Sequence, residues 1–359
     1  MVVKNRRLKR ILKLIAYISV IHLFLISCLF AFIMFTRGQK YNLKIKGTLF
    51  VVNQADESIT VFDLSKGKTL KEIKLKTDAR EIVALPNNEI VITNHGDNYL
   101  PGKSISIFDT EELMFKRKIR LEGGVRPYGL ATLHNSKKVA VASSSNNNLL
   151  IVDTEKDSVE AVIPTQQKIS YKLVVHPFKP LAYVTNQKSG SVSLINYETK
   201  VVLKIIKTGY GTQGIDITPD GKEVWVTNAR ENTISVINTE TNTVEDTLNT
   251  GKGAYRLKFS LDGKYAFVTN AYDGTIFVFD RSIRYKIKTI TLPGKSSFIQ
   301  RVLYHTPKPI DMFMHPNRQH AFIVNSNADK VEVLDLKTLK IVGNINTGNV
   351  PSTLVITDF

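Results

Sequence analysis

The stretch LAYVTN (residues 181–186) decides the fold of this chain, because close copies of it return as EVWVTN (223–228) and YAFVTN (265–270). Looser copies keep the apolar alternation and the polar last residue, and they end at Asn53, Asn94, Ser143 and Asn325. The seven copies are spaced 41 to 55 residues apart. A period of about 42 residues indicates a repeat architecture, in which every repeat forms the same structural unit.

The pattern of each repeat predicts four short strands. In residues 212–247 the segments GIDI, EVWVTN, ISVIN and TVEDTL are rich in β-branched residues, and the turn sequences TPDG and TETN lie among them. The third strand ends ten residues after the phrase in six copies, at Asp63, Asp153, Asn196, Asn238, Asp280 and Asp335. Because a lone four-stranded sheet cannot bury both faces, such units stack as blades. The sequence therefore predicts an all-β fold, a seven-bladed β-propeller over residues 48–359.

The two ends of this region predict how the ring closes. The first repeat lacks an inner strand, since YNLKIK (41–46) leads directly into its phrase. After the last outer strand the chain continues with PSTLVITDF (351–359), which matches the inner-strand pattern of GIDITPD. We expect residues 353–357 to complete blade 1 by pairing with residues 49–53, because this pairing removes two open sheet edges.

The phrase YVTN, together with SVSLIN, TISVIN and TPDGK, resembles the YVTN family of β-propeller repeats over residues 48–359. The third repeat departs most, with VAVASSS in place of the phrase. The resemblance implies a seven-bladed, extracytoplasmic propeller. Similar families include surface and periplasmic proteins, subunits of amine dehydrogenases and relatives of lactonase propellers. The motif specifies a fold and leaves the activity open.

The N-terminal segment predicts a membrane anchor. Residues 1–13 form a basic tail, and residues 14–35 (LIAYISVIHLFLISCLFAFIMF) contain no Asp, Glu, Lys or Arg. Twenty-two apolar residues in a helix can cross a bilayer, and the basic tail should stay in the cytoplasm. We therefore expect a transmembrane signal anchor, a linker at residues 36–47 and an extracytoplasmic propeller. An alternative is a lipoprotein anchored at Cys28, because LISC (25–28) resembles a lipobox.

The charge and cysteine content of the chain limit the classes of partner that it can have. The formal charge is +17, but residues 1–40 carry eight Lys or Arg and no acid, which leaves 41 basic and 32 acidic residues. This moderate surplus on an exported domain disfavours nucleic acid as the partner. Cys28 is the only cysteine, so intrachain disulfides and cysteine-based zinc sites are excluded. We expect a surface glycan, another anionic ligand or a protein partner instead.

The entrances of the seven inner strands predict the main binding site, since they converge on one end of the central channel. Polar and aromatic residues predominate there: Arg80, Glu81, Tyr128, Tyr171, Lys172, Gln213, Tyr255, Arg256 and Asp311, with Arg126 nearby. Four basic residues against two acidic ones favour an anionic or sugar-like ligand. The alternative is that these side chains form structural ion pairs around the channel.

Two insertions fall on the same face of the predicted ring. They are HGDNYLPGK (95–103) in the second repeat and LPGKSSFIQRVLYHTPKP (292–309) before the seventh. Because blades 7 and 2 flank blade 1, these loops can meet above it and form a contact site. The candidate residues are His95, Asp97, Tyr99, Phe298, Arg301, Tyr304 and His305.

Signatures of catalysis are scarce. The sequence contains no GxSxG, HExxH, Walker or GxGxxG motif and requires no cofactor. Glu81 and Asp311 could supply oxygen ligands to Ca²⁺ or Mg²⁺, but Lys172 and Arg256 compete for the same carboxylates. We expect a binding or scaffold module. The alternative is a lactonase- or lyase-like enzyme with a metal-assisted site at the channel mouth.

Overall fold

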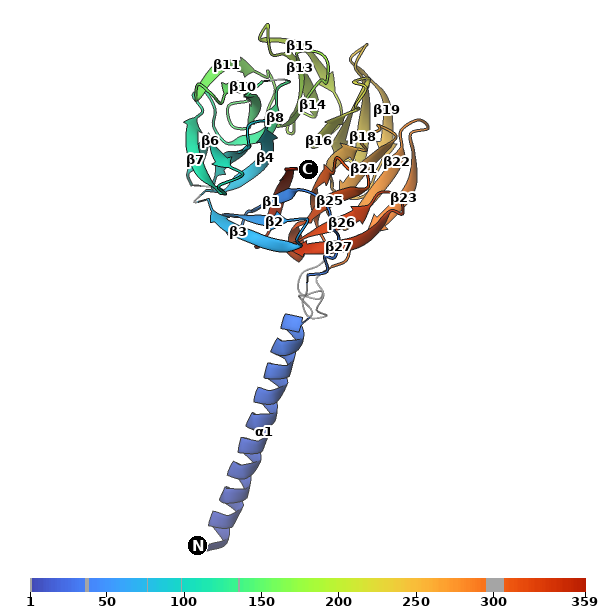
Figure 1. The fold of residues 1–359 in the computed structure, drawn as a ribbon. Coiled ribbons are helices and arrows are strands. Elements are labelled where there is room, and N and C mark those ends of the chain that lie inside the picture. The colour runs from blue at the N-terminus through green and yellow to red at the C-terminus, as the bar shows by residue number, and fades with distance from the viewer. Residues whose placement is uncertain (1, 36–38, 76, 98, 135, 295–306) are drawn as a thin grey trace.

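Four antiparallel strands form each blade of the propeller, and seven blades surround one axis (Figure 1). The computed structural model describes residues 2–35, 39–75, 77–97, 99–134, 136–294 and 307–359. Blades 1 to 4 are β28 (Pro351–Thr357), β1 (Thr48–Asn53), β2 (Ser58–Asp63), β3 (Lys68–Lys74); β4 (Ala79–Leu85), β5 (Glu89–Gly96), β6 (Pro101–Asp109), β7 (Met114–Arg120); β8 (Pro127–Thr132), β9 (Lys138–Ser143), β10 (Asn148–Asp153), β11 (Ser158–Pro164); and β12 (Ser170–Val175), β13 (Leu181–Asn186), β14 (Ser191–Asn196), β15 (Val201–Lys207).

The remaining blades complete the ring. Blades 5 to 7 are β16 (Thr212–Ile217), β17 (Glu223–Asn228), β18 (Thr233–Asn238), β19 (Thr243–Asn249); β20 (Ala254–Phe259), β21 (Tyr265–Asn270), β22 (Thr275–Asp280), β23 (Tyr285–Thr291); and β24 (Pro309–Met314), β25 (His320–Asn325), β26 (Lys330–Asp335), β27 (Lys340–Asn346). A short 3₁₀ helix, η1, spans Ser326–Ala328, and the N-terminal helix α1 spans Val2–Phe35. The predicted fold, blade number and third-strand ends are confirmed.

The C-terminal strand closes the ring as the sequence predicts. Strand β28 pairs antiparallel with β1, and the register joins Leu49 to Ile356 and Val52 to Thr353. Blade 1 therefore combines the last strand of the chain with the first three. This pairing leaves no unpaired inner edge between the two ends of the repeat array.

The hydrophobic core lies between neighbouring blades. Trp225 is fully buried and contacts the rings of Phe259 and Phe279, with ring centroids 5.4 and 6.3 Å apart. The second strand of each blade is buried almost throughout, whereas the outer strands such as β3 and β23 are mostly exposed. Trp225 is therefore a core residue, as its place in an alternating strand predicts.

The repeated Asn ties the second strand to the third. In blade 4 the Nδ2 group of Asn186 donates to the hydroxyls of Ser191 (3.3 Å) and Ser193 (2.9 Å). The Asn residues at the same position in other blades donate to equivalent hydroxyls; these pairs are Asn53 with Ser58 and Thr60, Asn94 with Ser104 and Ser106, Asn228 with Thr233 and Ser235, and Asn270 with Thr275. The repeated Asn therefore has a structural role, in hydrogen bonds to side chains of the next strand.

The Thr before this Asn serves a second structural purpose. The pairing of each inner strand with its neighbour shifts near its start, which frees the amide of its third residue. The Thr hydroxyl accepts a hydrogen bond from that amide in four blades, from Glu81 to Thr93, Lys172 to Thr185, Gly214 to Thr227 and Arg256 to Thr269. The phrase thus recurs because it satisfies polar groups that the blade geometry exposes within the core.

The segment that follows α1 packs against the propeller. The hydroxyl of Tyr41 donates to the carbonyl oxygen of Leu64 (2.8 Å), and its ring packs edge-on against Phe62. Lys40 forms a β-bridge with Asn344 of β27. Helix α1 itself contains one segment, Leu12–Leu29, that is long and apolar enough to cross a membrane and is not buried in the protein.

Candidate functional site

Three positions of the inner strands point their side chains toward the ring axis. The second residues form what we call the tyrosine layer: Arg80, Tyr128, Tyr171, Gln213, Tyr255, Ile310 and Ser352. The third residues form the ionic layer: Glu81, Gly129, Lys172, Gly214, Arg256, Asp311 and Thr353. The fifth residues line the cavity layer: Val83, Ala131, Val174, Asp216, Lys258, Phe313 and Val355. The register shift near the strand start is what allows two successive residues to face the axis.

The tyrosine layer closes the channel at the entrance of the inner strands. The hydroxyl of Tyr171 donates to that of Tyr128 (2.5 Å) and lies 3.1 Å from that of Tyr255. The rings of Tyr128 and Tyr171 stack with their centroids 3.9 Å apart. Burial raises the pKa of both Tyr128 and Tyr171 well above the ordinary value, so these hydroxyls stay neutral.

The ionic layer lies directly beneath and its charges cancel. Glu81 accepts from Lys172 Nζ (2.6 Å) and from Arg256 Nη2 (2.7 Å). Arg256 Nε lies 2.7 Å from Asp311 Oδ1, and Thr353 donates to Asp311 Oδ2 at 2.6 Å. Burial by itself would raise the pKa of Glu81, but Arg256 and Lys172 together hold it below its ordinary value. Each of the four charged groups of this layer therefore has an oppositely charged partner within the layer.

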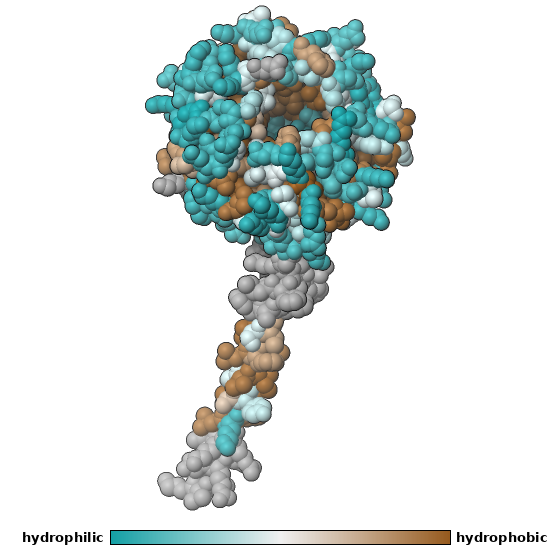
Figure 2. All heavy atoms as spheres, in the orientation of Figure 1, coloured by the Kyte–Doolittle hydropathy of each residue, from teal (hydrophilic) through white to brown (hydrophobic). Residues whose placement is uncertain are grey.

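A cavity of about 740 Å³ opens beyond the ionic layer, at the ends of the inner strands. Figure 2 shows this hollow at the centre of the ring, with hydrophobic side chains visible inside it. Its wall is mostly apolar and includes Leu85, Leu130, Leu133, Val175, Ile217 and Phe313. The C-terminal Phe359 lies at its edge. The cavity is thus an apolar cup with a charged floor.

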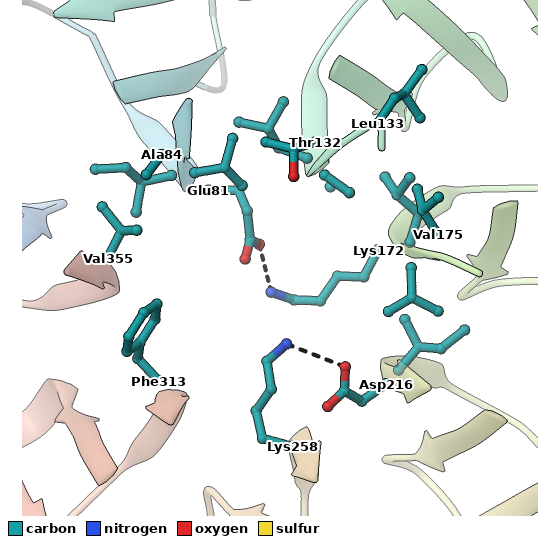
Figure 3. Close-up of a pocket in the computed structure, with 18 of the residues that line it drawn as sticks. Glu81, Ala84, Thr132, Leu133, Lys172, Val175, Asp216, Lys258, Phe313 and Val355 are labelled. Carbon is teal, nitrogen blue, oxygen red and sulfur yellow. Dashed lines mark hydrogen bonds and ion pairs between the residues drawn. The ribbon is translucent and has the colours of Figure 1, made fainter. Parts of the chain in front are cut away.

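One more charged pair lies in the wall of the cavity. Lys258 Nζ is 3.3 Å from Asp216 Oδ1, and Figure 3 shows Lys258 and Lys172 extending toward the centre of the cup. The Lys258 side chain is 29% exposed, compared with 6% for Lys172. Asp216 is held in place because its Oδ2 also accepts from the amide of Phe259. Lys258 is therefore the cavity cation that a ligand can reach most easily.

The structure brings together part of the site predicted at the inner-strand entrances. Arg80 pairs with Asp78 at 2.6 Å and its guanidinium lies 6.0 Å from the centre of the Tyr128 ring. His95 packs edge-on against Tyr128, and burial, with Arg80 nearby, lowers its pKa to about 4. Arg126 lies in the adjoining loop, where its backbone amide donates to the carbonyl of Gly102.

The two predicted insertions are described only in part. Tyr99 is 91% exposed, at the tip of the blade 2 insertion. Arg301, Tyr304 and His305, like Phe298, lie outside the described residues. The predicted contact between the two loops therefore stays a prediction.

The electrostatics of the entrance differ from the open, positively charged mouth that the sequence favours. Arg80 has Asp78 as a partner, which the sequence argument did not include, and Lys172 and Arg256 are engaged by Glu81. The competition of Lys172 and Arg256 for the carboxylates is thus confirmed. At this end the hydroxyls of Tyr128, Tyr171 and Tyr255 lie within 3.3 Å of one another and the charges are paired, while the cavity lies at the other end of the inner strands.

Asp216 and Lys258 were not among the residues selected from the sequence. A signal for them was available, because both occupy the fifth position of neighbouring inner strands. The other five strands carry Val, Ala or Phe at that position, as at Val83, Ala131, Val174, Phe313 and Val355. Because the fifth position is apolar in the other five inner strands, two opposite charges at this position indicate a polar feature of the channel.

Glu81 and Asp311 do not fit the Ca²⁺ or Mg²⁺ site that the alternative, metal-assisted function would need. Among the described residues no three His, Cys, Asp or Glu side chains lie together in a way that could hold a metal ion. Both oxygens of Glu81 already accept from cations, and both oxygens of Asp311 are engaged. A metal would have to compete with Lys172 and Arg256 for each carboxylate.

Comparisons with known proteins agree with this fold. Residues 156–296 match the family model of YNCE-like β-propellers. A functionally unknown protein from Desulfotomaculum acetoxidans is similar, with a TM-score of 0.70 and 17% identity over 86% of this chain and 98% of that chain. No curated protein sequence matches the chain.

Two lactonase-type structures are also similar. The periplasmic gluconolactonase of Pseudomonas aeruginosa has a TM-score of 0.68 and 17% identity, covering 87% of this chain and 99% of that chain. A putative 6-phosphogluconolactonase from Bacteroides fragilis has a TM-score of 0.68 and 15% identity, covering 87% and 98%. At these identities the similarity establishes the propeller fold alone.

Proposed function

We propose that this protein is a membrane-anchored binding module whose propeller holds a small organic anion in the central cavity. The observation that carries the proposal is Lys258, a partly exposed cation that extends into an apolar cup. A volume of about 740 Å³ is in the range of pockets that enclose small ligands. Such a ligand would place its acidic group at Lys258 and its apolar body against Leu130, Val175 and Phe313.

The charges on the cavity floor support this choice of ligand. Lys172 and Arg256 already share Glu81, so their positive charge is compensated. The pair between Lys258 and Asp216 is longer, at 3.3 Å, and less buried. Lys258 can therefore exchange its partner for a ligand carboxylate or phosphate at a lower cost in desolvation.

The ligand proposal predicts a specific thermal response. In lipid nanodiscs the full-length protein should be stabilised by hexanoate and benzoate in a dose-dependent way, and not by the corresponding neutral amides. A ligand at 100 times its Kd stabilises a fold by about 2.7 kcal/mol. The measurement is Tm against ligand concentration. Lys258→Gln should abolish the response, while Lys222→Gln, which changes an exposed lysine, should retain it.

Two other results would redirect the proposal. If no carboxylate raises Tm, or if Lys258→Gln responds like the unchanged protein, the cavity does not bind organic anions and a protein partner becomes the better candidate.

A lactonase-like reaction is the competing function. It is tested in the same samples by following the hydrolysis of added lactones, which a pure binding module leaves intact.

The anchor completes the proposal. We infer that α1 is an uncleaved signal anchor, with the basic tail in the cytoplasm and the propeller outside. In support, α1 runs without interruption from Val2 to Phe35, so Cys28 lies inside the helix. Protease treatment of intact cells should cut an outward-facing propeller and spare an inward-facing one. The mass of the membrane-bound protein distinguishes the alternatives, because a signal anchor keeps residues 1–27, whereas a lipoprotein anchored at Cys28 has lost them and carries lipid.

A further inference from the structure

The tether between α1 and the propeller is short and ends at a fixed point. Helix α1 ends at Phe35, and Gln39 already donates from its Nε2 to the carbonyl of Gly67 at 3.2 Å. An extended chain spans at most about 3.6 Å per residue, so these four steps cover about 14 Å. Wherever the helix leaves a membrane, the docking point of the propeller lies close to that surface.

The docking point lies on blades 1 and 7. The amide of Asn344 in β27 donates to the carbonyl of Lys40 (2.8 Å), and Tyr41 is buried against blade 1. Further along, His315 of blade 7 bonds the carbonyl of Lys46 at 3.0 Å through its Nε2. Figure 1 shows β3 and β27 on the side of the ring from which the chain leads to α1. These contacts prevent the tether from swinging to another blade.

The surface around this point concentrates the positive charge of the propeller. We call residues 40–47, 64–74 and 336–346 the anchor rim; they contain one acidic residue, Glu72, and nine exposed lysines, namely Lys40, Lys44, Lys46, Lys66, Lys68, Lys71, Lys74, Lys337 and Lys340. From Lys40 onward the chain carries 42 basic and 32 acidic residues. Outside the anchor rim 33 basic and 31 acidic residues nearly cancel.

Protection of sheet edges accounts for only part of this distribution, because the outer strands β15 (VVLKIIK) and β23 (YKIKTIT) carry two exposed lysines each, whereas the anchor rim carries nine. Lysines on outer strands do discourage edge-to-edge aggregation. However, the outer strand β19 (TVEDTLN) is acidic, and the basic β7 pairs its Lys116 and Arg117 with Glu89. In the anchor rim, the ion pair found among the described residues is Lys66 with Asp63, at 3.1 Å. Apart from Lys66, the lysines of the rim thus have no ion pair among the described residues.

From these observations we infer that the anchor rim rests on the anionic phospholipid headgroups of the membrane that holds α1. The inference depends on the proposed anchoring. Basic residues next to a membrane anchor are attracted to acidic lipids, and the attraction is lost within a Debye length, about 10 Å at 0.1 M salt. The tether, at most about 14 Å long, is short enough for the rim to come within that reach. Contact through blades 1 and 7 leaves the cavity mouth, which lies on the ring axis, open to solvent.

Energy transfer from the rim to labelled lipids tests this contact. The full-length chain with Cys28→Ser and Thr69→Cys, labelled at Cys on β3, is placed in nanodiscs that contain an acceptor-labelled lipid. Transfer should be higher in discs of phosphatidylcholine with phosphatidylglycerol than in phosphatidylcholine alone, and high salt should remove the difference. Changing Lys66, Lys68, Lys71 and Lys337 to Gln should lower transfer to the value in neutral discs.

The matched control changes four exposed lysines on blades 4 and 5, Lys200, Lys204, Lys207 and Lys222, to Gln. This variant has the same net charge as the rim variant and should keep the lipid dependence. Equal transfer in neutral and anionic discs, or an equal loss of transfer in both variants, overturns the inference about the rim but does not contradict the proposed membrane anchor. Failure of the chain to co-elute with nanodiscs would instead overturn the anchoring and this inference with it.

Discussion

Replacing Glu81 by Ala is expected to destabilise the propeller by about 3–5 kcal/mol, because the change leaves buried cations without their counterion. The side chains of Lys172 and Arg256 are 6% and 13% exposed, and both bond to Glu81. Arg256 keeps Asp311 as a partner, whereas Lys172 loses its ion pair. The measurement is Tm of the full-length protein in nanodiscs, with the unchanged chain alongside.

An exposed ion pair provides the control for Glu81. Glu155 pairs with Lys137 at 2.5 Å, but the two side chains are 60% and 42% exposed. Water already solvates both groups, so Glu155→Ala should cost at most about 1 kcal/mol. If Glu81→Ala and Glu155→Ala lower Tm by the same amount, the ionic layer is not the buried, charge-balanced element described above. Adding Lys172→Met to Glu81→Ala should restore part of the loss, since it removes the unpaired cation.

The second large effect concerns Glu332, which should make the propeller less stable as the pH rises toward neutrality. Glu332 occupies the position of β26 at which other blades carry the hydroxyls of Thr60, Ser106, Ser193 and Ser235. It is 1% exposed, its Oε1 accepts from Asn325 at 3.4 Å, and its Oε2 has no hydrogen-bond partner. Burial raises the pKa of Glu332 from 4.5 to about 7.

The sign of the pH effect follows from this pKa. Between pH 4.5 and about 7 the folded state holds a proton on Glu332 that the unfolded state has released. Stability from this group is therefore complete below pH 4.5 and falls as the pH rises to about 7, by about 3 kcal/mol in total. His95 acts in the opposite sense over part of this range, because its pKa of about 4 in the folded state lies below the ordinary 6.5 and its contribution to stability therefore rises with pH.

The effect of Glu332 is measured as the difference in Tm between the unchanged chain and Glu332→Gln, compared at about pH 5 and about pH 8, because His95 titrates identically in both. The Glu332→Gln variant should lose this part of the pH dependence and should be the more stable protein at the higher pH. Glu240→Gln, on an exposed turn, is the control and should follow the unchanged chain. A Glu332→Gln variant with the same pH dependence as the unchanged chain would show that this carboxyl is already solvated.

Most residues of the candidate site could be located from the repeat alignment, but the alignment could not show whether their charges are free or paired. The residues at the inner-strand entrances converge on the axis because all seven strands have the same register, which a period of about 42 residues already implies. Whether Lys172 and Arg256 would be free or paired depends on distances across the ring. Glu81 and Arg256 are 175 residues apart in the chain, and no local pattern encodes their 2.7 Å contact.

The propeller, its seven blades and the closing strand could all be predicted from the sequence, because they depend on local alternation of apolar residues and on a spacing that recurs in each repeat. Trp225 as a core residue and the structural use of the repeated Asn follow from the same regularity. The contacts among Tyr128, Tyr171 and Tyr255 at the entrance and the position of the cavity at the other end could be seen only in the folded ring. The tertiary structure also placed Lys258 beside Asp216 and left Glu332 buried with an unpaired oxygen. These outcomes depend on side chains from different blades meeting near the axis or between sheets, where burial and pairing are set by the whole ring.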